Sequence, residues 1–162
     1  MKFYVKQKVF SLRDKFKISD ANQKELFQVG GKFFSLQNKL ELQNLDGSVV
    51  LHAKKQVLSF MPKYFIYTPH DDEVAIIQRK FGFKPKFEVS VGHDTLNVQG
   101  SLFGHSFQIY HNEQMVASIQ KKVISWGDTY EIEVLEENQT ELFLFIVIII
   151  DQVIHEQKQN RY

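Results

Sequence analysis

The segment Leu142-Phe-Leu-Phe-Ile-Val-Ile-Ile-Ile150 is the longest apolar run in a chain of 162 residues. It has no hydrophobic period, so periodicity alone does not distinguish a buried strand from a buried helix. The run continues through Asp151-Gln-Val-Ile-His-Glu156 without a turn signal, and this length favours a helix over about 140–157. Asn138 and Glu141 have the spacing of a capping box at its start. A helix that is apolar on every side must be surrounded by protein, so we expect it at the centre of the fold.

The chain before this helix consists of short segments rich in Phe, Val, Ile and Tyr, with turn residues every 8 to 12 positions. Such spacing is typical of an all-β sandwich or barrel. Alternation in Phe16-Lys-Ile18 indicates a half-buried strand, and dipeptides such as Gly30-Gly31 and Asp46-Gly47 indicate turns. The predicted strands are Phe3–Phe10, Phe16–Ser19, Glu25–Val29, Lys39–Gln43, Val49–Lys54, Tyr64–Thr68, Glu73–Gln78, Lys86–Val91, Leu96–Gly100, Phe107–Tyr110, Met115–Ile119 and Tyr130–Val134.

These strands form a weak internal repeat. From Phe16 onward, similar strand starts recur at intervals of 24, 24, 23, 20 and 23 residues. The clearest copies are Gly47–Ser59 and Glu113–Ser125, which both end in Lys-Lys-x-φ-φ-Ser, where φ is aliphatic. Such an array predicts a meander whose closure removes exposed edges, and a solenoid is the competing interpretation. A barrel wider than about eight strands needs something inside it, and the apolar helix can fill this one.

The paired units at 47–59 and 113–125, together with the helix at 140–157, resemble the tubby C-terminal-like superfamily, and more narrowly the LURP-one-related family and its small bacterial members. The resemblance covers nearly the whole chain. It implies a single domain over 1–162: a closed, twelve-stranded antiparallel β-barrel over 3–134 with a central hydrophobic C-terminal α-helix. Within the superfamily, tubby proteins bind phosphoinositides, phospholipid scramblases have lipid-associated roles and plant members have roles in defence. It implies no catalytic residues.

Composition limits the classes of function. The absence of cysteine excludes disulfides, thiolate metal sites and cysteine nucleophiles, and it favours a cytoplasmic protein. A net charge of +1 argues against nucleic acid as a partner. Residues 1–86 carry 16 Lys/Arg and 8 Asp/Glu, and residues 87–162 carry 4 and 11, which permits a basic face unless the two halves interleave. The nine-residue apolar run is shorter than the roughly 20 residues of a membrane-spanning helix, so we expect no integral membrane protein.

Basic residues are the candidate binding residues. Lysines at strand ends can neutralise phosphoryl oxygens, although they are also common solubilising residues there. The segment Arg79–Lys86 interleaves cations with Phe81 and Phe83, a mixture that suits a membrane surface or base stacking. Alternatively, these aromatic side chains cap the end of the barrel. The candidate lipid-binding residues are Lys54, Lys55, Arg79, Lys80, Lys84, Lys86, Lys121 and Lys122.

Catalytic and metal-binding motifs are missing from the sequence. The six histidines show no compact ligand spacing, and there is no nucleophile elbow or phosphate loop. Asp151 and His155 are four residues apart, so on a helix they share a face. There they could orient a base, or they mark the polar end at which a buried helix meets solvent. We expect no enzyme, no cofactor and no metal, unless the barrel holds a roomy polar pocket beside these two residues.

The sequence therefore predicts a non-catalytic binding or scaffold module. The first hypothesis is salt-sensitive association with anionic phospholipid headgroups, which would place a cytoplasmic protein at the membrane periphery. The second is a barrel that binds an unknown protein, with salt-tolerant binding and no headgroup preference. The third is a barrel that holds a small ligand in an interior cavity.

Overall fold

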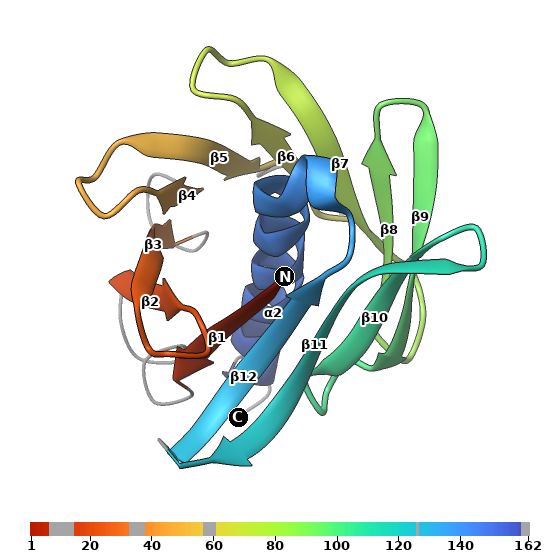
Figure 1. The fold of residues 1–162 in the computed structure, drawn as a ribbon. Coiled ribbons are helices and arrows are strands. Elements are labelled where there is room, and N and C mark those ends of the chain that lie inside the picture. The colour runs from red at the N-terminus through yellow and green to blue at the C-terminus, as the bar shows by residue number, and fades with distance from the viewer. Residues whose placement is uncertain (7–14, 33–37, 57–60, 126, 160–162) are drawn as a thin grey trace.

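A computed structural model of the chain describes residues 1–6, 15–32, 38–56, 61–125 and 127–159. Across these residues, twelve antiparallel strands close into a barrel in the order β1-β12-β11-β10-β9-β8-β7-β6-β5-β4-β3-β2, with one long helix inside it (Figure 1). The elements are β1 (Lys2–Lys6), β2 (Lys15–Ser19), β3 (Glu25–Lys32), β4 (Lys39–Gln43), β5 (Val49–Lys55), β6 (Lys63–Tyr67), β7 (Glu73–Lys80), β8 (Lys86–Val91), β9 (Asp94–Ser101), β10 (Ser106–His111), β11 (Gln114–Ile124), β12 (Gly127–Val134), the 3-10 helix η1 (Glu137–Gln139) and α2 (Thr140–Gln159). The predicted barrel is confirmed, and the solenoid is excluded.

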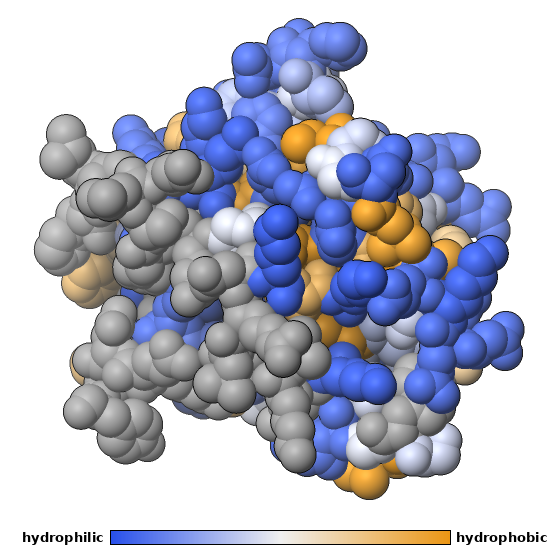
Figure 2. Space-filling model, turned by 90° about the vertical axis from the view of Figure 1, so that its left-hand side faces the viewer, coloured by the Kyte–Doolittle hydropathy of each residue, from blue (hydrophilic) through white to orange (hydrophobic). Residues whose placement is uncertain are grey.

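In the strands of the barrel wall, apolar residues that face the interior alternate with polar residues that face solvent. In β2, Phe16 and Ile18 are buried while Lys15 and Lys17 are exposed. Among the coloured residues of the face in Figure 2 most are hydrophilic, and hydrophobic residues show between them near the middle. The two neighbours of β1 close the barrel unequally, since β12 pairs with it over five residues, whereas Tyr4 and Ser19 form the single residue pair with β2 in the described chain.

Helix α2 fills the barrel and supplies the core. Every residue from Phe143 to Asp151 is at most 3% exposed. The stretch Glu137–Glu156 is long and apolar enough to cross a membrane, but 61% of it is buried inside the barrel. A helix that is apolar all round satisfies its backbone groups internally and leaves only side chains to pack, which is why it suits the inside of a barrel.

The start of helix α2 differs from the predicted capping box. Asn138 lies within η1 and is therefore not the N-cap of a capping box. The Thr140 hydroxyl instead donates to the backbone carbonyls of Glu136 and Glu137. The predicted helix over 140–157 is otherwise confirmed, with two more residues at its C-terminal end.

Several strand boundaries also differ from the prediction, most of all those of β3, β11 and β12. Gly30 and Gly31 lie inside β3, opposite Glu41 and Leu40 of β4, and do not form a turn. A Cβ at Gly31 would lie 2.3 Å from the Lys39 carbonyl oxygen, so glycine is required by a close strand approach there. Strands β11 and β12 are longer than predicted because their extra pairs, such as Lys122 with Thr129, carry polar side chains that hide the apolar alternation. The last four residues of the predicted strand Phe3–Phe10 lie outside the described chain.

Candidate functional site

The two ends of the barrel differ in charge. Because neighbouring strands are antiparallel, successive connections alternate between the ends. The end at which α2 finishes, drawn lowermost in Figure 1, carries the connections after β5, β7, β9 and β11. We call it the basic end. The described basic side chains on or near it are Lys6, Lys15, Lys39, Lys54, Lys55, Lys63, Arg79, Lys80, Lys84, Lys86, Lys121 and Lys122.

The opposite end, at which α2 begins, is acidic. On or near it, the described chain has three basic side chains, Lys2, Lys24 and Lys17, and the Lys17 ammonium lies 2.6 Å from Glu25. We call it the acidic end. Its acidic side chains are Asp20, Glu25, Asp46, Asp71, Asp72, Glu73, Asp94, Glu113, Glu133, Glu136, Glu137 and Glu141.

This separation matters although the net charge of the chain is only +1. The eight residues of β7 span about 27 Å along the strand, or about 20 Å along a barrel axis after strand tilt. The Debye length at physiological ionic strength is about 8 Å. A ligand at the basic end therefore experiences mainly the local positive charge, because salt screens the acidic end.

All the lysines and the arginine predicted from the sequence lie at the basic end. Lys54 and Lys55 finish β5, and Arg79 and Lys80 finish β7. Lys121 and Lys122, expected at a strand end, lie inside β11, two to three residues before its last residue, Ile124. They were expected at a strand end because the predicted strand stopped at Ile119, whereas β11 continues to Ile124.

Three ion pairs reduce the net positive charge of the basic end. The Lys122 ammonium lies 2.7 Å from Glu131, that of Lys39 lies 2.8 Å from Glu41, and that of Lys80 lies 3.5 Å from Glu88. These acidic partners lie on the outside of the barrel wall and leave an excess of positive charge at its rim.

The β7–β8 connection exposes two aromatic rings at the basic end. Strands β7 and β8 pair as far as Lys80 opposite Lys86, and the loop between them buries Pro85 but leaves Phe81, Phe83 and Lys84 exposed. Phe81 is 77% exposed and Phe83 is fully exposed. These exposures contradict the alternative that the two rings cap the barrel. Val123 of β11 is a further exposed apolar residue at the same end.

Four lysines of the basic end were not among the candidate binding residues predicted from the sequence. Lys6, Lys15, Lys39 and Lys63 are not part of a Lys-Lys or Arg-Lys pair, and such pairs are the signal in the sequence. Lys6 and Lys15 also line a surface hollow of about 510 Å³ beside the short β1–β2 contact. Assigning charges to alternate connections of the predicted meander, rather than to halves of the chain, would have identified all four.

A second group of polar side chains lies inside the barrel near the basic end. Asp151 and His155 project from α2, and His105 comes from the β9–β10 connection. Nδ1 of His105 lies 2.7 Å from Oδ1 of Asp151, and Nδ1 of His155 lies 3.2 Å from Oδ2. The two imidazole rings are 3.9 Å apart between centroids, and the Tyr130 ring meets both edge-on. His105 was missed because 46 residues separate it from Asp151.

Asp151 is fully buried and lies against the imidazoles of His105 and His155. Burial by itself would raise the pKa of Asp151, but the neighbouring imidazoles of His105 and His155 lower it below its usual value. Burial, with a smaller contribution from the Asp151 charge, raises the pKa of Tyr130 to about 12. Asp151 is completely buried, so it does not mark a polar end of the helix that faces solvent. The carboxylate is thus ionised and enclosed.

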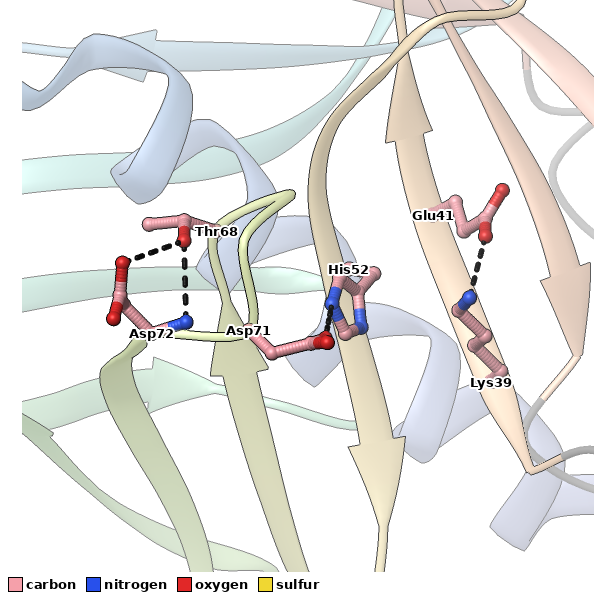
Figure 3. Close-up of polar contacts among 6 residues, drawn as sticks. All are labelled: Lys39, Glu41, His52, Thr68, Asp71 and Asp72. Atoms are coloured by element: carbon pink, nitrogen blue, oxygen red, sulfur yellow. Dashed lines mark hydrogen bonds and ion pairs between the residues drawn. The ribbon is translucent and has the colours of Figure 1, made fainter.

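A single histidine–aspartate pair, which joins β5 to the β6–β7 turn, lies away from this cluster. Nε2 of His52 lies 2.9 Å from Oδ1 of Asp71 in the β6–β7 turn, and Figure 3 shows this contact beside the Lys39–Glu41 pair. Asp71 itself is exposed. The contact joins two neighbouring hairpins, and Thr68 and Asp72 hydrogen-bond to each other within the turn.

Comparison with known proteins agrees with this architecture. An X-ray structure of the Arabidopsis thaliana protein AT5G01750 superposes with a TM-score of 0.66 at 20% identity, covering 94% of this chain and 90% of that one. The Bacillus subtilis (strain 168) protein named "Uncharacterized protein YxjI" is 30% identical over 162 residues, which are 99% of this chain and 98% of the relative. The sequence profile of the LURP-one-related family matches residues 1–151. The chain therefore belongs to the LURP-one-related family.

Proposed function

We propose that the protein is a non-catalytic binding module that associates reversibly with anionic phospholipid surfaces through the basic end of its barrel. The exposed Phe81 and Phe83 carry this proposal, because they stand among Arg79, Lys80, Lys84 and Lys86 at one end of the molecule. Cations beside outward-facing aromatic rings are typical of proteins that bind at the membrane interface.

The cations and the exposed aromatic rings each supply part of the free energy of binding to the membrane. A lysine or arginine near an anionic leaflet contributes about 1 kcal/mol, and burying a phenylalanine in an apolar phase contributes about 1.5–3 kcal/mol. Two kinds of contact are needed because a single weak anchor binds membranes only marginally. The basic end has both kinds, since its cations surround the Phe81–Phe83 loop.

The charge separation also fixes an orientation. An anionic surface attracts the basic end and repels Asp46, Asp71 and Asp72 at the acidic end. The barrel axis, and α2 with it, would therefore stand roughly upright on the surface, with the β7–β8 loop toward the lipid. This is a peripheral arrangement on the cytoplasmic face, and α2 stays inside the barrel throughout.

Catalysis has less support. Asp151 and His105 are the buried acid and base of the basic end, and both are at least nine-tenths covered by protein. We therefore assign the exposed rim, and not the enclosed cluster, to recognition.

Liposome flotation tests the proposal. The full chain is mixed with vesicles of phosphatidylcholine alone, of phosphatidylcholine with phosphatidylserine, and of phosphatidylcholine with a phosphoinositide, at low and at physiological salt. We expect flotation with both anionic compositions, weakening with salt, and none with the neutral vesicles. No flotation in any condition, or salt-independent flotation with neutral vesicles, would overturn the proposal. So would preferential binding to a single-stranded oligonucleotide offered in competition.

A pair of variants tests whether vesicle binding depends on the Phe81–Phe83 loop or on any exposed apolar side chain. Replacing Phe81 and Phe83 by serine removes the exposed rings at the basic end, and we expect vesicle binding to fall at least about tenfold. Leu45→Ser is the matched control, because Leu45 is an exposed apolar residue at the acidic end. An equal loss of binding in the control would show that the basic end is not the contact surface.

A further inference from the structure

We propose that His105, Asp151 and His155 form a binding site for a divalent transition-metal cation of the Zn²⁺ type. The site is separate from the exposed rim and does not depend on lipid binding. It joins the β9–β10 connection to the last third of α2 inside the basic end of the barrel.

The geometry suits a metal with few ligands. One donor atom from each of the three side chains lies within 4.8 Å of the other two. In a tetrahedral zinc site with metal–ligand bonds of 2.0–2.1 Å, neighbouring ligand atoms are about 3.3 Å apart. The imidazole nitrogens lie 2.7 Å from Oδ1 and 3.2 Å from Oδ2 of Asp151, so the carboxylate has one oxygen beside each imidazole. Side-chain rotations that spread the three donor atoms to tetrahedral spacing would admit the cation.

One observation independent of this spacing points to a ligand, and a second shows how the turn holds His105 in place. Asp151 is fully buried, and its Oδ2 accepts no hydrogen bond, because His155 Nδ1, 3.2 Å from it, hydrogen-bonds to the backbone carbonyl oxygen of Asp151 instead. Leaving a buried carboxylate oxygen in this state costs free energy that a cation would recover. His105 adopts a positive φ of 53°, an uncommon conformation for a residue other than glycine. The β9–β10 turn thus holds its imidazole against Asp151 despite a backbone cost.

The donor set determines which metals fit. Two imidazoles and one carboxylate suit Zn²⁺ and its first-row neighbours, whereas Ca²⁺ and Mg²⁺ prefer oxygen ligands only. Tyr130 packs edge-on against both imidazoles and restricts their rotation. Three protein ligands leave a fourth tetrahedral position for water or an anion.

The same distances also fit a chain of hydrogen bonds in which the imidazoles share protons with Asp151, so the experiment must distinguish a metal site from such a network. The full chain, first stripped with a chelator, is titrated with Zn²⁺ by calorimetry and with Co²⁺ by visible absorption. We expect saturable one-to-one binding, a tetrahedral Co²⁺ spectrum, and a melting temperature roughly 5–10 °C higher at a Zn²⁺ concentration a hundredfold above Kd. Absence of saturable binding, or binding only at millimolar metal, would overturn the proposal.

Matched variants locate the metal. His105→Gln and His155→Gln should each weaken Zn²⁺ binding at least about a hundredfold and abolish the Co²⁺ spectrum. His111→Gln is the control, because His111 also lies near an aspartate, 3.5 Å from Asp94, but is exposed on the barrel wall. We expect the control to bind like the wild type. Unchanged binding in His105→Gln, or equal loss in His111→Gln, would assign the metal elsewhere. Both glutamine variants keep Asp151, so neither leaves an empty cavity at the core carboxylate.

Discussion

Oε1 of Glu131 lies 2.7 Å from the ammonium of Lys122, although only 5% of the glutamate side chain is exposed. The same carboxylate accepts hydrogen bonds from the Tyr4 hydroxyl, at 2.9 Å, and from the Gln120 amide, at 3.1 Å. One side chain on the outer wall thus links β1, β11 and β12. Burial alone would raise the pKa of Glu131, but the hydrogen bonds from Lys122, Tyr4 and Gln120 lower it to about 2.

Glu131 should make the stability of the barrel depend on acid. Because its folded pKa lies below the unfolded value of 4.5, its stabilisation is complete above that value and is lost as the pH falls toward 2. We expect Glu131→Gln to lower the free energy of unfolding by about 2–3 kcal/mol at pH 7 and by less than half as much at pH 3. Urea unfolding at both pH values measures this, and an equal loss at pH 7 and pH 3 would contradict it.

The central helix should tolerate no charge. Ile146 and Ile148 are completely buried, so Ile146→Asp or Ile148→Asp places an unpaired carboxylate in the core. This costs several kcal/mol against a total stability of about 5–15 kcal/mol, and we expect the whole barrel to unfold. Ile146→Val is the control, with an expected loss of about 0.5–1.5 kcal/mol. Circular dichroism and thermal melts report the result, and an aspartate variant that melts like the wild type would refute the central-helix packing.

Gly100 should be irreplaceable in β9. It has a φ of 121°, and a Cβ there would lie 2.7 Å from the Ser106 carbonyl oxygen. We expect Gly100→Ala to destabilise the protein by about 3 kcal/mol, since it combines backbone strain with a steric clash. Gly47 has a φ of 90° with open space around it, so Gly47→Ala should cost only about 1 kcal/mol. Chemical denaturation of the two variants side by side checks the difference, and equal losses would show that the clash is relieved by relaxation.

Charge reversal at the basic end should weaken binding to anionic vesicles. Lys54→Glu combined with Lys55→Glu removes two cations, each contributing about 1 kcal/mol at an anionic surface, so affinity should fall at least about 30-fold. Lys24→Glu, at the acidic end, should change it little. Vesicle co-sedimentation at two salt concentrations measures both the affinity and its salt dependence. If the double variant binds like the wild type, these two lysines do not contact the membrane.

Much of the fold could be predicted because its signals are local. Alternation in β2 and β8 and the aromatic strand starts mark the wall one strand at a time. Errors arose where the local signal is ambiguous. Gly30-Gly31 looks like a turn but serves a close strand approach, and the Lys121-Lys122 pair hides the continuation of β11.

The sequence by itself determined the barrel and its central helix, because a continuous apolar run and alternating strands specify which side chains leave water, and burial of apolar surface dominates folding. Only the tertiary structure decided which distant residues meet. The meander brings alternate connections to one end, which gathers the lysines there and exposes Phe83, and it places His105 against Asp151 across 46 residues of chain. No local spacing encodes such a contact, since it depends on how every intervening strand pairs.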